Sequence, residues 1–164
     1  MSLSTFLGPA VIGLAAAAGA YALWTRRSRT YYSSESVASA YDAWTEDRLL
    51  ETLWGEHVHL GHYGDPPVRR DFRQAKADFV HELVHWSGLD RLPPGSKVLD
   101  VGCGIGGSAR ILARDYGFDV LGISISPAQV KRATDLTPEN LSCRFEVMDA
   151  LDLKLEDGTF DGVW

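Results

Sequence analysis

An aspartate and closely spaced glycines lie between Asp100 and Gly107. Gly102, Gly104 and Gly107 form the pattern G-x-G-x-x-G, which is typical of dinucleotide-binding loops. Asp100, Gly102, Gly104 and Gly106 also form a second pattern, D-x-G-x-G-x-G. Glycines let a backbone pass close to a bound molecule, because they have no Cβ atom. The spacing predicts a nucleotide-like ligand without choosing among such ligands, and a plain strand-to-helix turn is the alternative.

The charge of Asp100 narrows the choice of ligand. A carboxylate beside the loop favours positive charge, such as the ammonium and sulfonium of S-adenosylmethionine, over a pyrophosphate. Dinucleotide enzymes place an acid about 20 residues beyond the glycines. This chain has Ser124 there, and no arginine immediately follows to favour NADP. The residues therefore favour S-adenosylmethionine over NAD or NADP as the cofactor.

Three polar residues near the ends of predicted strands are candidates for further cofactor contacts. Ser124 and Gln129 could hydrogen-bond ribose hydroxyls, and Asp149 could reach an adenine amino group. Turn capping explains Ser124 and Asp149 about equally well, and a solvated helix face explains Gln129. Their shared placement at strand ends favours the binding interpretation.

A glycine-bounded loop from Gly55 to Gly64 contains three histidines, His57, His59 and His62. A metal site is disfavoured, because neither a cysteine nor a helical histidine pair accompanies them. A histidine can instead act as a general base or as a hydrogen-bond partner for a substrate. We therefore take His57 and His59 as candidate catalytic residues, with an ordinary loop as the alternative.

The composition excludes other classes of protein. A net charge of -6 disfavours nucleic acid as a partner, because such binders rely on basic side chains. Cys103 and Cys143 provide neither a disulfide framework nor a metal-ligand cluster, which indicates a reducing compartment. We interpret Cys103 as a small side chain within a tight turn rather than a nucleophile, since no base is adjacent in sequence.

The elements that position these residues alternate between strand and helix. Apolar runs predict strands at 97–101, 118–124, 144–148 and 160–164, with helices at 108–116 and 127–136. This order is typical of an α/β fold with a Rossmann-like, doubly wound parallel sheet, wrapped by helices on both faces. One or two amphipathic helices follow Ser36, and a further helix from Asp71 to Trp86 is predicted to pack against the sheet.

An uncharged run extends from Phe6 to Trp24. As a helix it would span about 28 Å, against a hydrocarbon core of about 30 Å. Arg26, Arg27 and Arg29 follow the run and no basic residue precedes it, which favours an uncleaved membrane anchor with the catalytic domain on the cytoplasmic side. An interfacial helix or a soluble packing helix is the alternative. The expected parts are an anchor with its basic flank at 1–30, a helical lid region at 31–92 and a cofactor-binding domain at 93–164.

Three motifs resemble those of class I S-adenosylmethionine-dependent methyltransferases. They are D-V-G-C-G-I-G-G from Asp100, G-I-S-I-S-P from Gly122 with Gln129 beyond it, and M-D-A from Met148. The resemblance implies a seven-stranded sheet. This chain supplies three strands and ends within the fourth, so we expect a domain that is incomplete at its C-terminus and inactive alone.

Motifs before the glycine loop are similar to a narrower family. Y-D-x-W-T-E-D from Tyr41, W-G from Trp54 and H-x-H-x-G-x-Y from His57 resemble the 2-methyl-6-phytylbenzoquinol and gamma-tocopherol methyltransferases of photosynthetic organisms. Sterol C24-methyltransferases and cyclopropane synthases share parts of the pattern. The resemblance implies that Tyr41 lies over the cofactor, Asp100 and Gly102 lie near its amino acid portion, and Asp149 lies near adenine.

The same resemblance implies C-methylation of a prenylated quinol from the tocopherol or plastoquinone pathway. Such a lipophilic acceptor resides in a bilayer, which is consistent with an N-terminal anchor and with the membrane as a partner. A sterol or another lipid is the alternative acceptor. An NAD(P)-binding oxidoreductase and a non-catalytic, membrane-tethered binding module are the alternatives of other classes.

Overall fold

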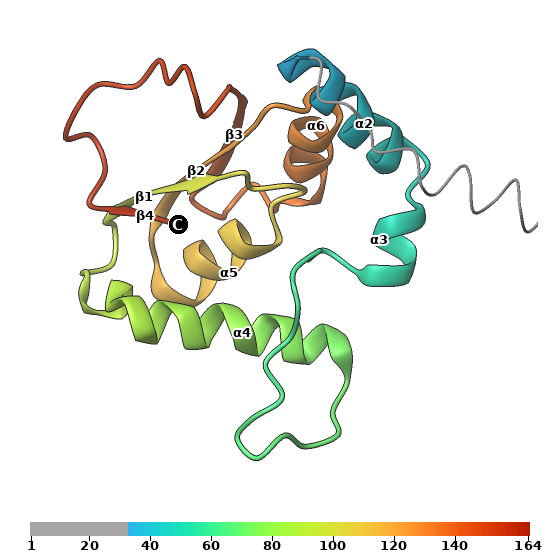
Figure 1. The fold of residues 1–164 in the computed structure, drawn as a ribbon. Helices are drawn as coiled ribbons and strands as arrows, with labels where there is room; N and C mark the ends of the chain where they lie inside the picture. Colours follow the sequence, from blue (N-terminus) through green and yellow to red (C-terminus); the bar gives the residue numbers. More distant parts are fainter. Residues whose placement is uncertain (1–32) are drawn as a thin grey trace, which may run out of the picture. The chain divides into compact units, whose positions relative to one another are not determined.

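A parallel sheet of four strands, in the order β3-β2-β1-β4, organises residues 33–164, the part of the chain that the computed structural model describes (Figure 1). The strands are β1 (Lys97–Val101), β2 (Asp119–Ser124), β3 (Cys143–Val147) and β4 (Gly162–Val163). The helices are α2 (Ser34–Glu46), α3 (Leu49–Trp54), α4 (Phe72–Ser87), α5 (Gly107–Tyr116) and α6 (Pro127–Leu136), with a 3-10 turn η1 at Leu89–Arg91. The predicted α/β order of alternating elements is confirmed.

The two central strands are buried on both faces. Val98 of β1 lies opposite Val120 of β2, and Leu99 lies opposite Leu121. All four side chains are at most 4% exposed, which explains why the strand sequences are continuously apolar rather than alternating. This pairing fixes the position at which β1 ends and the glycine loop begins.

Side-chain caps define the ends of two helices that sequence patterns predict. The Asp71 carboxylate accepts hydrogen bonds from the backbone N–H groups of Arg73 and Gln74 and so begins α4. The Ser126 hydroxyl accepts a hydrogen bond from the Gln129 N–H, and Pro127 occupies the first turn of α6. The predicted extents of both helices agree with the structure to within one residue.

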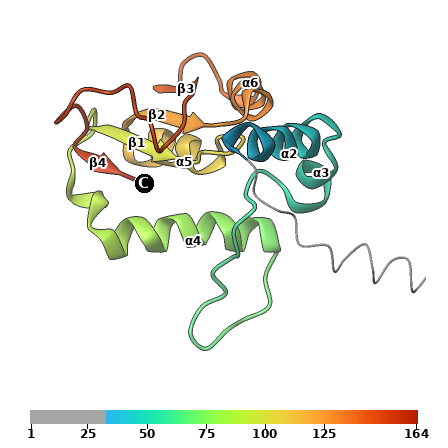
Figure 2. The same ribbon diagram turned by 45° about the horizontal axis from the view of Figure 1, so that its top comes forward.

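The two faces of the sheet are covered differently. Val80 and Val84 of α4 and Leu112 of α5 pack with Val98 and Val120 in one cluster, and both helices lie on one side of the sheet (Figure 1). On the other face, Leu99, Leu121 and Ile123 contact a cluster of partly buried residues, Met148, Leu155 and Phe160. These residues belong to the irregular segment between β3 and β4, which lies across the sheet from α4 (Figure 2). We expected helices on both faces, but within residues 33–164 this segment contains none.

The predicted anchor at Phe6 to Trp24 lies outside the described residues. Within residues 33–164, no helix combines the length and the apolar character needed to cross a membrane.

Candidate functional site

The candidate site is a cavity of ≈ 460 Å³ at the carboxyl ends of β1 and β4. The chain proceeds from β1 through β2 to β3 in one direction and then returns to place β4 on the opposite side of β1. Ligands of open α/β sheets bind where the strand order reverses in this way. Asp100 to Ile105, from the end of β1 into the glycine loop, supply one wall, and Trp164 contributes just after β4.

The glycine loop exposes bare backbone to this cavity. Gly102 and Gly104 have φ values of 79° and 56°, and a Cβ atom added to either would meet nothing within 4 Å. Gly106 behaves differently, because its added Cβ would lie 2.6 Å from the Phe145 ring. Gly106 does not line the cavity, so the structure gives it a packing role against β3, and cofactor contact by Gly106 stays a prediction.

Asp100 is the acidic residue of the glycine-loop wall. The residue is 3% exposed, and its Oδ2 atom has no hydrogen-bond partner among residues 33–164. Burial raises the pKa of the Asp100 carboxyl to about 7, although a hydrogen bond from the Ala109 backbone acts in the opposite direction. An unpartnered buried oxygen that borders a cavity fits a ligand that brings a positive charge or a hydrogen-bond donor.

The opposite wall comes from α2, α3 and the loop 55–59. We call these three parts together the lid. Tyr41 and Trp44 of α2 line the cavity, and their rings meet edge to face with centroids 5.6 Å apart. Val58 adds another apolar side chain. Tyr41 therefore lines the cavity, and its predicted position over a bound cofactor stays a prediction.

His57 and His59 also line the cavity and contact each other. His59 Nδ1 lies 2.8 Å from the Leu60 carbonyl oxygen, and His59 Nε2 lies 3.1 Å from His57 Nδ1. In the neutral pair, His59 therefore donates through Nδ1 and accepts the Nδ1–H of His57, which leaves the Nε2 lone pair of His57 available. Burial, followed by the charge of His59, lowers the pKa of His57 to about 4. His57 consequently stays neutral near pH 7 and is a better hydrogen-bond acceptor than proton acceptor.

The remaining predicted residues separate into two groups. Gln129 lines the cavity, and its Oε1 accepts a hydrogen bond of 2.8 Å from the Ser124 hydroxyl. Ser124 is buried behind Gln129 and also accepts the Ser126 backbone N–H. Asp149 lies outside the cavity lining and caps the backbone N–H of Leu151 at 2.9 Å. The structure thus shows the capping roles of Ser124 and Asp149, and their cofactor contacts stay predictions.

Two side chains of the loops have no catalytic features. Burial raises the pKa of the Cys103 thiol to about 12, so the thiol stays protonated, as expected of a small packing residue. His62 is absent from the cavity lining. No group of three or more candidate metal ligands occurs within residues 33–164.

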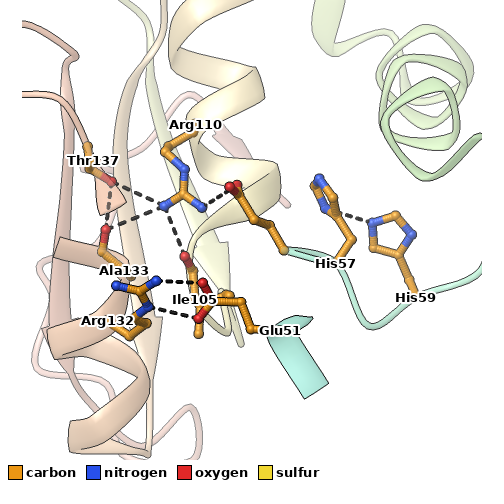
Figure 3. A network of polar contacts seen from close by, with 9 residues as sticks. Glu51, His57, His59, Ile105, Arg110, Arg132, Ala133 and Thr137 are labelled. Atoms are coloured by element: carbon orange, nitrogen blue, oxygen red, sulfur yellow. Dashed lines mark hydrogen bonds and ion pairs between the residues drawn. The ribbon is translucent and has the colours of Figure 1, made fainter. Parts of the chain in front are cut away.

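Sequence reasoning did not identify two arginines that join the lid to the sheet domain. Arg110 of α5 contacts Glu56, and Arg132 of α6 binds Glu51 through two hydrogen bonds of 2.8 and 2.5 Å (Figure 3). The partners in these pairs are 54 and 81 residues apart in sequence. No local sequence pattern predicts either pair. The one signal in the sequence is the position of Arg110, one helical turn after Gly107, which indicates that it lies beside the glycine loop.

Comparisons with known proteins agree with this geometry. Residues 98–164 match the family model described as a methyltransferase domain. The chain is 63% identical over 153 residues to the 2-methyl-6-phytyl-1,4-hydroquinone methyltransferase of Synechocystis sp., covering 93% of this chain and 47% of that protein. The chain thus spans about half the length of this curated relative.

Two solved structures show the same fold. The [4+2]-cyclase SpnF superposes with a TM-score of 0.70 at 32% identity, covering 81% of this chain and 48% of that one. The magnesium protoporphyrin IX methyltransferase of Synechocystis PCC 6803, with bound S-adenosylmethionine, superposes with a TM-score of 0.55 at 25% identity, covering 83% and 62%. Because one of the two is named as a cyclase, the fold alone does not choose the reaction.

Proposed function

We propose that the protein, whose residues 98–164 match the family model described as a methyltransferase domain, is an S-adenosylmethionine-dependent methyltransferase acting on a ring carbon of a prenylated quinol. The observation that carries this proposal is the 63% identity over 153 residues to a methyltransferase named for a phytylated hydroquinone. The identity extends over both the lid and the glycine loop, which together enclose the cavity.

The cavity has the features that S-adenosylmethionine requires. Gly102 and Gly104 offer open backbone, and the unpartnered oxygen of Asp100 suits the cationic amino acid portion. Gln129 would hold a ribose hydroxyl, and Tyr41 would cover the cofactor. Bound S-adenosylmethionine supplies a methyl group on a sulfonium, already activated for displacement by a carbon nucleophile.

The chain's own contribution to such a reaction is positioning and exclusion of water. Tyr41, Trp44 and Val58 form an apolar wall over the cavity. The available Nε2 of the neutral His57 would accept a hydrogen bond from a quinol hydroxyl and orient the ring, with His59 fixing the His57 tautomer. Loss of the hydroxyl proton makes the ring carbon nucleophilic, and a base with a pKa of about 4 favours this loss only weakly.

A membrane anchor in residues 1–30 would fit such an acceptor. The apolar run and its following arginines support a bilayer attachment with the catalytic domain on the cytoplasmic side. A prenylated quinol resides in the same bilayer, so the anchor would raise its local concentration at the cavity.

The test of the proposed function begins with binding. The full-length protein is titrated calorimetrically with S-adenosylmethionine and, in parallel, with NADH and NADPH. It is then incubated with methyl-labelled S-adenosylmethionine and a panel of prenylated quinols, tocopherols and sterols. Label transferred to a prenylated quinol supports the proposal. Binding of NADH or NADPH alone, or label on sterols alone, contradicts it.

A further inference from the structure

One part of the lid, the loop 55–59, packs against the start of α5, and we call this loop the strap. It lies against Gly107, the first residue of α5. A Cβ atom on Gly107 would lie 2.7 Å from the Glu56 carbonyl oxygen and 2.7 Å from His57 Cε1. Real Cβ atoms do not approach other atoms this closely, so only glycine lets the strap lie at this depth.

One turn further along α5, Arg110 holds the same strap by its charge. Arg110 is 7% exposed, and its Nη2 donates a hydrogen bond of 2.7 Å to Glu56 Oε2. Nη1 donates to the Ile105 carbonyl oxygen at 2.9 Å and to the Thr137 hydroxyl at 3.2 Å (Figure 3). A single side chain therefore connects the strap, the glycine loop and the end of α6.

A second cation holds the strap from α4. Lys76 is 5% exposed, and its Nζ donates to the carbonyl oxygens of Trp54 at 2.9 Å and His57 at 2.6 Å. These bonds fix the backbone at both ends of the segment that contains Glu56. The contacts of Lys76 do not reach the glycine loop, whereas those of Arg110 do.

We propose that Arg110 is a positioning residue that, with the bare surface of Gly107, keeps the strap closed over the cavity and registered against the glycine loop. The inference rests on the proposed function only in that S-adenosylmethionine is the ligand retained. The guanidinium binds Ile105 in the glycine loop and Glu56 in the strap at the same time. If the strap moves, Arg110 moves with it, and the glycine loop that would contact the cofactor loses this hydrogen bond. Release of the strap from Arg110 gives the ligand a route into and out of the cavity.

The test compares three variants with a matched control on the same helix. Gly107→Ala puts a methyl group beneath the strap, and Glu56→Gln and Arg110→Met remove the ion pair. The control is Arg114→Met, because Arg114 is exposed and pairs with its neighbour Asp115. Stopped-flow dissociation of S-adenosylmethionine from the full chain should be about 10-fold faster in each variant and unchanged in the control.

A second measurement does not depend on the cofactor. NMR titration of the His57 imidazole should show its pKa rising from about 4 toward 6.5 in Gly107→Ala, because an open strap exposes the ring without changing any charge. Alanine favours a helix more than glycine does, so the substitution retains α5 itself.

The two measurements separate the two proposals. A wild-type protein that does not bind S-adenosylmethionine contradicts the proposed function, while the His57 titration still decides the role of the strap. Wild-type binding together with unchanged dissociation rates and an unchanged His57 pKa in the variants overturns the inference. If Arg110→Met does not fold, Glu56→Gln and Gly107→Ala carry the same comparison.

Discussion

The Asp42 carboxylate of α2 accepts a hydrogen bond of 2.5 Å from the Ser126 hydroxyl, the residue that caps α6. The same Oδ1 atom accepts the Ala128 backbone N–H at 3.1 Å. A lid residue thus completes the N-terminal cap of a helix in the sheet domain, which couples the docking of α2 to the end of β2.

Asp42→Ala should lower the free energy of unfolding by about 1 kcal/mol, the usual cost of losing a capping side chain. The reason is that the Ala128 N–H loses its partner while the Ser126 hydroxyl loses its acceptor. Urea denaturation measures the difference. Glu46→Ala, an exposed acid on the same helix, is the control, and equal stability of the two variants would contradict the capping role.

Asp100 should make cofactor affinity depend on pH. Because burial raises the pKa of Asp100 to about 7, the carboxyl becomes neutral as the pH falls below that value and loses its attraction for a cationic ligand. We expect S-adenosylmethionine to bind more weakly at pH 6 than at pH 8, and Asp100→Asn to bind weakly at both. Calorimetry at the two values measures this, and a wild-type affinity independent of pH would disprove the assignment.

The same carboxyl should affect stability in the unliganded protein. The folded chain retains the Asp100 proton between pH 3.8 and about 7, whereas the unfolded chain releases it, so stability falls as the pH rises through this window. The loss is on the order of 4 kcal/mol, measured as wild type relative to Asp100→Asn. His57, whose pKa is lowered to about 4, has the opposite trend, but it is present in both proteins and cancels in the difference. A difference that stays constant with pH would contradict the raised pKa.

Local sequence signals predicted the elements well because their causes are local. Asp71 and Ser126 begin helices through hydrogen bonds to N–H groups two or three residues away, and Gly88 and Gly117 end helices with positive φ. The strand at Lys97–Val101 was predicted at its observed bounds, since both faces are covered and every central side chain must be apolar or small, apart from Asp100.

Contacts across long sequence separations were not predictable in this way. Arg110 could have been a solvated charge on a helix, and only the fold brings Glu56 to its Nη2 atom. Likewise, the glycine pattern does not distinguish Gly104, which faces the cavity, from Gly106, which packs on Phe145. Which way a glycine faces depends on the backbone conformation of the loop, and the spacing of glycines in the sequence does not determine that conformation.

Gly104→Val should abolish cofactor binding. The φ of 56° at Gly104 strains a branched residue, and the added side chain would extend into the cavity, where a Cβ meets nothing within 4 Å. Gly158→Val is a matched control, because Gly158 has a φ of 72° and an equally open Cβ but does not line the cavity. Calorimetric binding by Gly104→Val at wild-type affinity would rule out backbone contact at this position.

Removal of residues 1–30 should release the protein from membranes. The uncharged run from Phe6 to Trp24 is long enough as a helix to cross the hydrocarbon core, and three arginines follow it directly. We expect the full-length protein to sediment with the membrane fraction through a carbonate wash at high pH, and the truncated protein to remain in the supernatant.

A variant with Leu14→Arg and Ala17→Arg is the control for the truncation. It retains residues 1–30, but two charges in the apolar run oppose insertion into the bilayer, so this variant should also remain in the supernatant. Membrane association of the truncated protein equal to that of the full chain would place the attachment elsewhere, and carbonate extraction of the full chain would show that residues 1–30 do not span the bilayer.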